Sequence, residues 1–148
     1  MRISSKGRYA LVSMINLAAH FDSGKFITVI SISEKFGISK IYLEQVFALL
    51  KKGGLVTSVK GSQGGYQISR SPDEITVFDI LSSIESTLFE KAEETVSESA
   101  PAYEKTLHSL VFDALDEDIK KSLSRVTLGN LVKEADKNAS EQSVMYYI

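Results

Sequence analysis

The sequence predicts a mainly α-helical fold with a small β wing, arranged as a winged helix-turn-helix head followed by a long helix. Three observations lead to this fold class. Apolar residues recur at helical spacing along most of the chain. Two short β-like runs flank a segment with three glycines in five positions, and a drifting apolar stripe follows residue 104. The 148 residues suffice for one domain with an appendage.

Capping residues and apolar stripes predict four helices in the head. Serine and threonine hydroxyls accept hydrogen bonds from the free N–H groups at a helix start, and glycine commonly follows a helix end. The helices are expected over residues 5–21, 29–36, 40–52 and 77–84, with Ser4 or Ser5, Thr28, Ser39 and Thr76 as their caps. Each carries an apolar face for a shared core.

A β-hairpin is expected between the third and fourth helices. Its strands are residues 55–60 and 66–70, and Gly61-Ser62-Gln63-Gly64-Gly65 joins them. Because glycine adopts backbone angles that other residues avoid, this composition is typical of a hairpin tip. Ile27 is expected to add a very short extended stretch before the second helix.

The chain changes character beyond the predicted head, residues 1–85. Residues 86–104 are rich in glutamate and predict an acidic loop. Residues 105–136 are expected to hold a long helix to about Ser124 and a short helix capped by Thr127, and residues 137–148 a polar tail. The stripe of the long helix needs a surface to bury against, either a second copy or the chain's own head. Its residues are Leu107, Leu110, Val111, Ala114 and Ile119.

Charge is divided between the two halves of the chain. Residues 1–70 contain ten lysines and arginines and three acidic residues, a net charge of +7, whereas residues 71–148 have a net charge of −9. The overall charge of −2 hides this asymmetry. It favours a basic face for a polyanion in the first half, although surface charge also varies by chance.

Several function classes are excluded by residue content. The chain has no cysteine, so it cannot form disulfides, thiolate metal sites or a cysteine nucleophile. There is no Gly-Lys-Ser/Thr phosphate loop and no histidine pair at metal spacing, so the chain is not expected to be an enzyme. No apolar run approaches a membrane span and no signal peptide is recognisable, which predicts a cytoplasmic protein without a membrane partner.

The predicted order of elements suits double-stranded DNA. A helix fits the major groove, where residues near its N-terminus reach base edges, and a wing can lie along the neighbouring backbone or minor groove. Winged helices also serve as protein-interaction modules, so a module acting through the acidic half and the tail is the alternative function.

Four segments of the head are more specific. They are Arg2-Ile3-Ser4-Ser5-Lys6-Gly7-Arg8-Tyr9-Ala10, Ile38-Ser39-Lys40-Ile41-Tyr42-Leu43-Glu44-Gln45-Val46-Phe47, Gly54-Leu55-Val56-Thr57-Ser58-Val59-Lys60-Gly61-Ser62-Gln63-Gly64-Gly65-Tyr66 and Ile75-Thr76-Val77-Phe78-Asp79-Ile80-Leu81. In this order they resemble the opening motif, recognition helix, wing and following helix of the Rrf2 family of bacterial regulators. Thr127-Leu128-Gly129-Asn130-Leu131 resembles its dimerisation region more loosely. The resemblance implies a homodimeric transcriptional repressor on a partly palindromic operator.

The resemblance also implies which side chains contact DNA. Glutamine can read adenine, and glutamate can accept from cytosine N4 while repelling phosphate. Tyr9 and Tyr42 fit the edge of the core equally well, and Ile41 replaces a small residue common at its position. The candidate DNA-binding residues are Ser5, Lys6, Arg8, Tyr9, Thr28, Ser39, Lys40, Tyr42, Glu44, Gln45, Lys60 and Gly61.

The missing cysteines distinguish two branches of this family. The iron–sulfur-sensing (IscR-like) branch has three cysteines in the loop that corresponds to residues 88–105, and without them His108 cannot hold a cluster. No cofactor and no metal is therefore expected. The chain resembles the cysteine-metabolism repressor (CymR-like) branch, whose regulators are partners of O-acetylserine thiol-lyase. This implies that the tail residues Tyr146, Tyr147 and Ile148 enter that enzyme's active site; alternatively, the tyrosines pack on the dimer.

Overall fold

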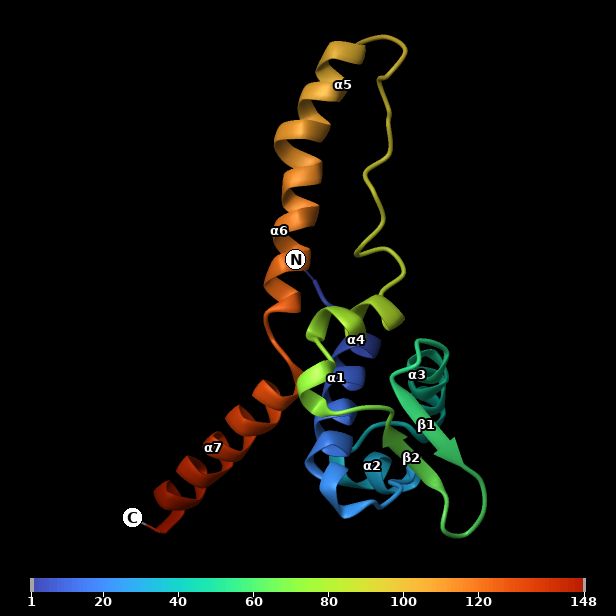
Figure 1. The fold of residues 1–148 in the computed structure, drawn as a ribbon, viewed down its shortest axis with the longest axis vertical. Helices are drawn as coiled ribbons and strands as arrows, with labels where there is room; N and C mark the ends of the chain where they lie inside the picture. The colour runs from blue at the N-terminus through green and yellow to red at the C-terminus, as the bar shows by residue number, and fades with distance from the viewer. Residues whose placement is uncertain (1, 148) are drawn as a thin grey trace.

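The computed structural model describes residues 2–147 and the side chains of residues 2–145. A helical head with a two-stranded wing carries two helical arms (Figure 1). The head contains α1 (Ser5–Ala19), α2 (Val29–Phe36), α3 (Lys40–Lys52), β1 (Val56–Val59), β2 (Gly65–Ile68) and α4 (Val77–Ile84), with short 3-10 turns η1 (Phe21–Ser23) and η2 (Pro72–Glu74). The arms are α5 (Pro101–Leu107), η3 (His108–Phe112) and α6 (Asp113–Ser124), then α7 (Leu128–Tyr147).

The four predicted helix caps are confirmed. The hydroxyl oxygens of Ser4, Thr28 and Ser39 accept hydrogen bonds from the backbone N–H groups of Gly7, Ser31 and Tyr42. Thr76 and Asp79 form a capping box, in which each side chain accepts from the other residue's N–H group. The first helix ends at Ala19 rather than Phe21, because the chain tightens there into the 3-10 turn η1.

One hydrophobic core joins the elements of the head. Its largest fully buried side chains include Phe47, Met14 and Ile32. The wing completes it on one side: β1 and β2 pair antiparallel with Val56 opposite Ile68. Ile27 forms the predicted short extended stretch, exchanging two backbone hydrogen bonds of 2.7 and 2.8 Å with Tyr66. The base of the hairpin is thus fixed to the segment that leads into α2.

The long helix runs through α5, η3 and α6 and projects away from the head (Figure 1). It begins at Pro101, so residues 101–104 of the predicted acidic loop are helical, and it ends at the predicted Ser124; residues 108–112 form a turn of π-helix. A π turn adds one residue to a helical turn, which rotates the following side chains and explains the drift of the apolar stripe. Its α6 end contacts the head, where the Lys120 ammonium lies over the Phe78 ring of α4. Its exposed apolar residues are Leu107, Leu110, Val111 and Leu115.

The last helix begins at the predicted Leu128 but is longer than predicted, so residues 137–147 of the predicted polar tail are helical. It continues from Leu128 to Tyr147 instead of ending near residue 135, because residues 130–147 contain neither glycine nor proline. Its first residue belongs to the core of the head, since Leu128 is fully buried and its N–H donates to the Ile75 carbonyl over 2.7 Å. The head is therefore built from residues on both sides of the long helix in the sequence. Within residues 2–147, none of the helices has the length and apolarity to cross a membrane.

We expect Leu128→Ala to lower the free energy of unfolding by about 2–5 kcal/mol, because it leaves a cavity in the core. Val144→Ala in the same helix is the control, since Val144 is 58% exposed, and it should change stability by less than about 0.5 kcal/mol. Urea denaturation measures both. Equal effects of the two substitutions would contradict the place of Leu128 in the core.

Candidate nucleic-acid interface

The N-terminal turns of α1 and α3 lie side by side on the surface of the head. The rings of Tyr9 and Tyr42 make an edge-to-face contact between them, with centroids 5.4 Å apart. Both tyrosines are half-buried, so they form the edge of the core and also face the surface. A hollow of about 490 Å³ opens here, lined by Ser5, Tyr9, Gly37, Ile38, Ser39, Ile41, Tyr42 and Gln45. It brings together five of the predicted DNA-contacting residues.

Three cationic residues neighbour the residues that line this hollow. The Lys6 ammonium lies 5.8 Å from the centroid of the Tyr42 ring, and Arg8 donates to the Ser5 hydroxyl over 3.2 Å. Lys40 pairs with Glu44 over 3.7 Å, but both side chains are more than half exposed, so the pair contributes only about 0.3 kcal/mol. A phosphate group can therefore compete for Lys40. The arrangement suits an anion such as phosphate, which attracts the cations and accepts hydrogen bonds from hydroxyl groups.

Helix α3 presents a polar face opposite its buried face. The buried stripe is Leu43, Val46, Phe47 and Leu50, whereas Ile41, Glu44 and Gln45 are exposed on the other side. Its 13 residues make a rod about 20 Å long, and an α-helix of this kind fits the major groove of B-DNA. Gly37, with φ +66°, ends α2 and turns the chain into α3.

The wing carries the remaining predicted contacts. Lys60 and Gly61 are exposed at the turn of the hairpin, which projects from the head (Figure 1). Gly65 has φ +137°, and a Cβ atom there would lie 2.7 Å from the backbone carbonyl carbon of Ile27. Only glycine allows this close approach of the wing to the segment before α2. The Lys51 ammonium donates to the Ser58 hydroxyl over 2.6 Å, which links the wing to the end of α3.

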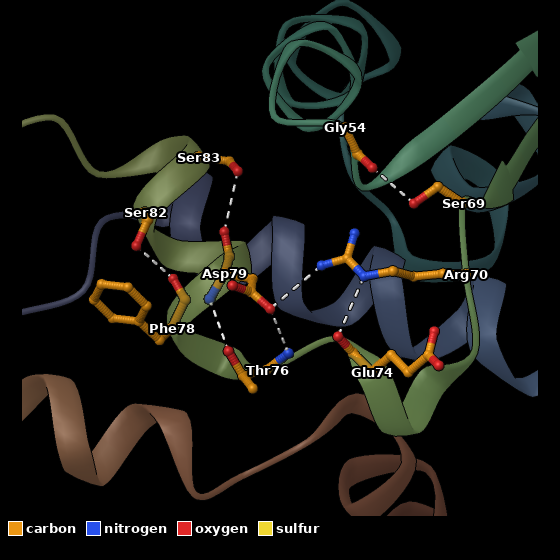
Figure 2. Close-up of polar contacts among 9 residues, drawn as sticks. All are labelled: Gly54, Ser69, Arg70, Glu74, Thr76, Phe78, Asp79, Ser82 and Ser83. Atoms are coloured by element: carbon orange, nitrogen blue, oxygen red, sulfur yellow. Dashed lines mark hydrogen bonds and ion pairs between the residues drawn. The ribbon is translucent and has the colours of Figure 1, made fainter.

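Arg70 connects the base of the wing to α4, as Figure 2 shows. Its guanidinium lies 3.5 Å from the Asp79 carboxylate and donates to the Glu74 carbonyl over 3.2 Å. Ser69 fastens the same segment to the end of α3, because its hydroxyl donates to the Gly54 carbonyl over 2.7 Å. The wing is therefore held at its base on two sides.

Some residues of the interface were not predicted. The Glu85 carboxylate accepts from the backbone N–H and the hydroxyl of Ser4, at 3.0 and 2.6 Å, so it already satisfies donors at the start of α1. The 81 residues that separate the pair leave no local signal.

Thr28, a predicted DNA-binding residue, lies at the start of α2. Its hydroxyl oxygen accepts from the Ser31 N–H, so only its O–H donor remains for a phosphate.

The acidic loop and the long helix meet in a second polar cluster. The Glu104 carboxylate is 5% exposed and accepts from the Val96 backbone N–H over 2.9 Å. His108 lies 3.4 Å from Glu104 and 3.6 Å from Asp113. Within residues 2–147, no group of three or more His, Asp and Glu side chains has the geometry to hold a metal ion. Glu104 fastens the loop to the helix instead.

The predicted interface and tail residues have different surroundings. Leu107, Leu110, Val111 and Ala114 are exposed on the long helix. Ile119 is half-buried and lines a hollow of about 460 Å³ with Phe78 and Phe89, so the protomer's own head and loop partly cover it. Tyr146 and Tyr147 end α7, and the positions of their side chains and of Ile148 lie outside the described residues.

The chain is similar in sequence and in fold to known transcriptional regulators. The family model Rrf2, described as an iron-dependent transcriptional regulator, matches residues 3–134. The transcriptional regulator IscR of Erwinia tasmaniensis is 35% identical over 92% of this chain and 81% of its own length. The structure of CymR (YrzC), the global cysteine regulator of B. subtilis, superposes with a TM-score of 0.71 at 31% identity, covering 90% of this chain and 98% of CymR. T. potens IscR has a TM-score of 0.68 at 36% identity, covering 93% and 90%.

Proposed function

Because this chain belongs to the Rrf2 family of transcriptional regulators, we propose that it acts in the cytoplasm as a homodimeric repressor that binds a partly palindromic operator. The observation that supports this most directly is the joint surface of α1 and α3. It combines the Tyr9–Tyr42 contact, three neighbouring cationic residues and the exposed face of a helix that is long enough to lie in a DNA groove. No enzymatic activity is part of the proposal, since the relatives are regulators.

In the proposed complex, α3 lies in the major groove. Gln45 reads a base edge, and Glu44 disfavours sites that bring a phosphate close to it. Phosphates lie at the hollow between α1 and α3, where Lys6, Arg8 and Lys40 supply charge and Ser5 and Ser39 supply hydroxyl donors. Lys60 and Gly61 of the wing follow the adjacent backbone or minor groove.

An iron–sulfur cluster does not fit this chain. Such clusters are held by thiolates, and the sequence contains no cysteine. The side chains near the acidic loop offer one imidazole, and the Glu104 carboxylate is already engaged with the Val96 N–H. We therefore propose a signal that reaches the regulator without a resident cluster.

Dimerisation is supported by the unburied stripe of the long helix. Leu110 is 74% exposed and Leu107, Val111 and Leu115 are 43–54% exposed, on a helix that projects from the head. An apolar face of this kind needs a partner surface in water. A second copy supplies one and places two α3 helices about 34 Å apart, one turn of DNA.

A role in cysteine metabolism is supported by the likeness to CymR, the global cysteine regulator of B. subtilis. We propose that the end of the chain, Tyr146, Tyr147 and Ile148, binds O-acetylserine thiol-lyase. Support comes from the described part of α7 that precedes the tail, since it extends away from the head (Figure 1) and residues 133–145 are exposed.

Affinity for operator DNA should fall steeply with salt. Contacts to about six phosphates predict a slope near −5 in a plot of log affinity against log salt concentration. Lys60→Ala should reduce the magnitude of this slope by about 1 per half-site, whereas Gln45→Ala should leave the slope unchanged and reduce discrimination between operator and random DNA. Fluorescence anisotropy at four salt concentrations measures both. Salt-independent binding, or affinity unaffected by both substitutions, would favour the protein-interaction module.

The double substitution Leu110→Asp and Val111→Asp should abolish the dimer, because it places charges in the proposed apolar contact. Sedimentation velocity should then show a species near 16.3 kDa instead of twice that mass. Val144→Asp on α7 is the control and should remain dimeric. A monomeric wild-type protein at about 50 µM, well above the dissociation constant of a stable dimer, would refute the interface.

The tail hypothesis is tested by footprinting the DNA upstream of this protein's own gene with and without purified O-acetylserine thiol-lyase. The enzyme should change the footprint of the full chain and leave that of a chain truncated after Met145 unchanged. A footprint of the full chain that is the same with and without the enzyme would contradict the tail hypothesis. It would not contradict the proposed repressor function.

A further inference from the structure

Ile41 is the most exposed large hydrophobic side chain among the described residues of the head, at 70%. It is the second residue of α3 and lies on the side opposite the buried stripe, two residues before Leu43. The head itself therefore cannot cover it. The exposed stripe of the long helix, through which we propose dimerisation, belongs to a different element and does not include Ile41.

The surroundings of Ile41 are polar and basic. It lines the hollow with Ser39, Tyr42 and Gln45, and Lys40 precedes it. Gln45 is one helical turn further along the same face, which puts the two Cβ atoms about 5–6 Å apart. A single apolar side chain thus stands beside a side chain capable of reading a base, on a surface that otherwise favours anions.

We propose that Ile41 reads the C5-methyl group of a thymine in the major groove. This inference rests on the proposed DNA-binding function and identifies a base that the operator must contain. Among the groups that base pairs present in the major groove, the thymine methyl is the apolar one. It is therefore the natural contact for an aliphatic side chain beside Gln45.

The spacing also fixes where this thymine lies. Successive base pairs are 3.4 Å apart, so the 5–6 Å between Ile41 and Gln45 Cβ atoms corresponds to one or two steps. Each half-site should contain a thymine, on either strand, within two base pairs of the base read by Gln45. Burial of one methyl group contributes about 0.8 kcal/mol, a factor of about four per half-site and about fifteen for two half-sites.

The test uses DNA selected by the wild-type protein from a random duplex pool. Each thymine of the selected consensus is replaced by deoxyuridine, which removes the C5-methyl group and leaves the hydrogen-bonding groups in place. Replacement of one particular thymine should lower the affinity of wild type about fourfold in a single half-site and about fifteenfold in both half-sites. Ile41→Ala should bind thymine and deoxyuridine operators equally, and its melting temperature should match that of wild type because the side chain is exposed.

Ile30→Ala is the matched control. Ile30 is the second residue of α2, as Ile41 is of α3, and it is 51% exposed. This variant should keep the wild-type ratio between the two operators. Loss of affinity in Ile41→Ala without a change in that ratio would overturn the inference, as would wild-type binding that is indifferent to every deoxyuridine. Failure to select any consensus would instead refute the proposed function itself.

Discussion

The arrangement of the molecule depends on the backbone and side-chain contacts around the start of α4. Asp79 accepts from the Thr76 N–H over 2.9 Å and faces the Arg70 guanidinium at 3.5 Å. Next to this capping box, the Val77 N–H donates to the Val126 carbonyl over 2.9 Å, and Thr76 forms an isolated bridge with Thr127. One short segment therefore holds the wing, α4 and the return of the long helix together (Figure 2).

This junction connects the proposed DNA-binding surface to the arms. Phe78 of α4 contacts Phe89 of the acidic loop edge to face, with centroids 5.0 Å apart, and the Lys120 ammonium of α6 lies 5.6 Å from its ring centroid. On the other side of α4, a Cβ atom at Gly53 would contact Ser83, so the end of α3 packs tightly against α4. The arm and α3 are thus connected through the packed side chains of α4.

The charges of the chain are also divided between the head and the arms. The basic first half of the sequence supplies the surface of α1, α3 and the wing, while the acidic residues lie mainly on the loop and arms. In the proposed complex, this separation keeps most carboxylates away from the DNA phosphates. In the loop, the buried Glu104 carboxylate ties Val96 to the long helix, so its conformation is held by a hydrogen bond where thiolate ligands are absent.

The sequence by itself determined the local features, because caps, glycines and apolar periodicity act over a few residues. Ser4, Thr28, Ser39 and Thr76 start the predicted helices, and α3 and the hairpin form where the sequence predicts them. The tertiary structure decided the rest. That Leu128 enters the core, that Glu85 reaches Ser4 and that Ile41 remains uncovered depends on contacts between distant segments. Such contacts are set by how whole helices pack, which no local pattern of residues encodes.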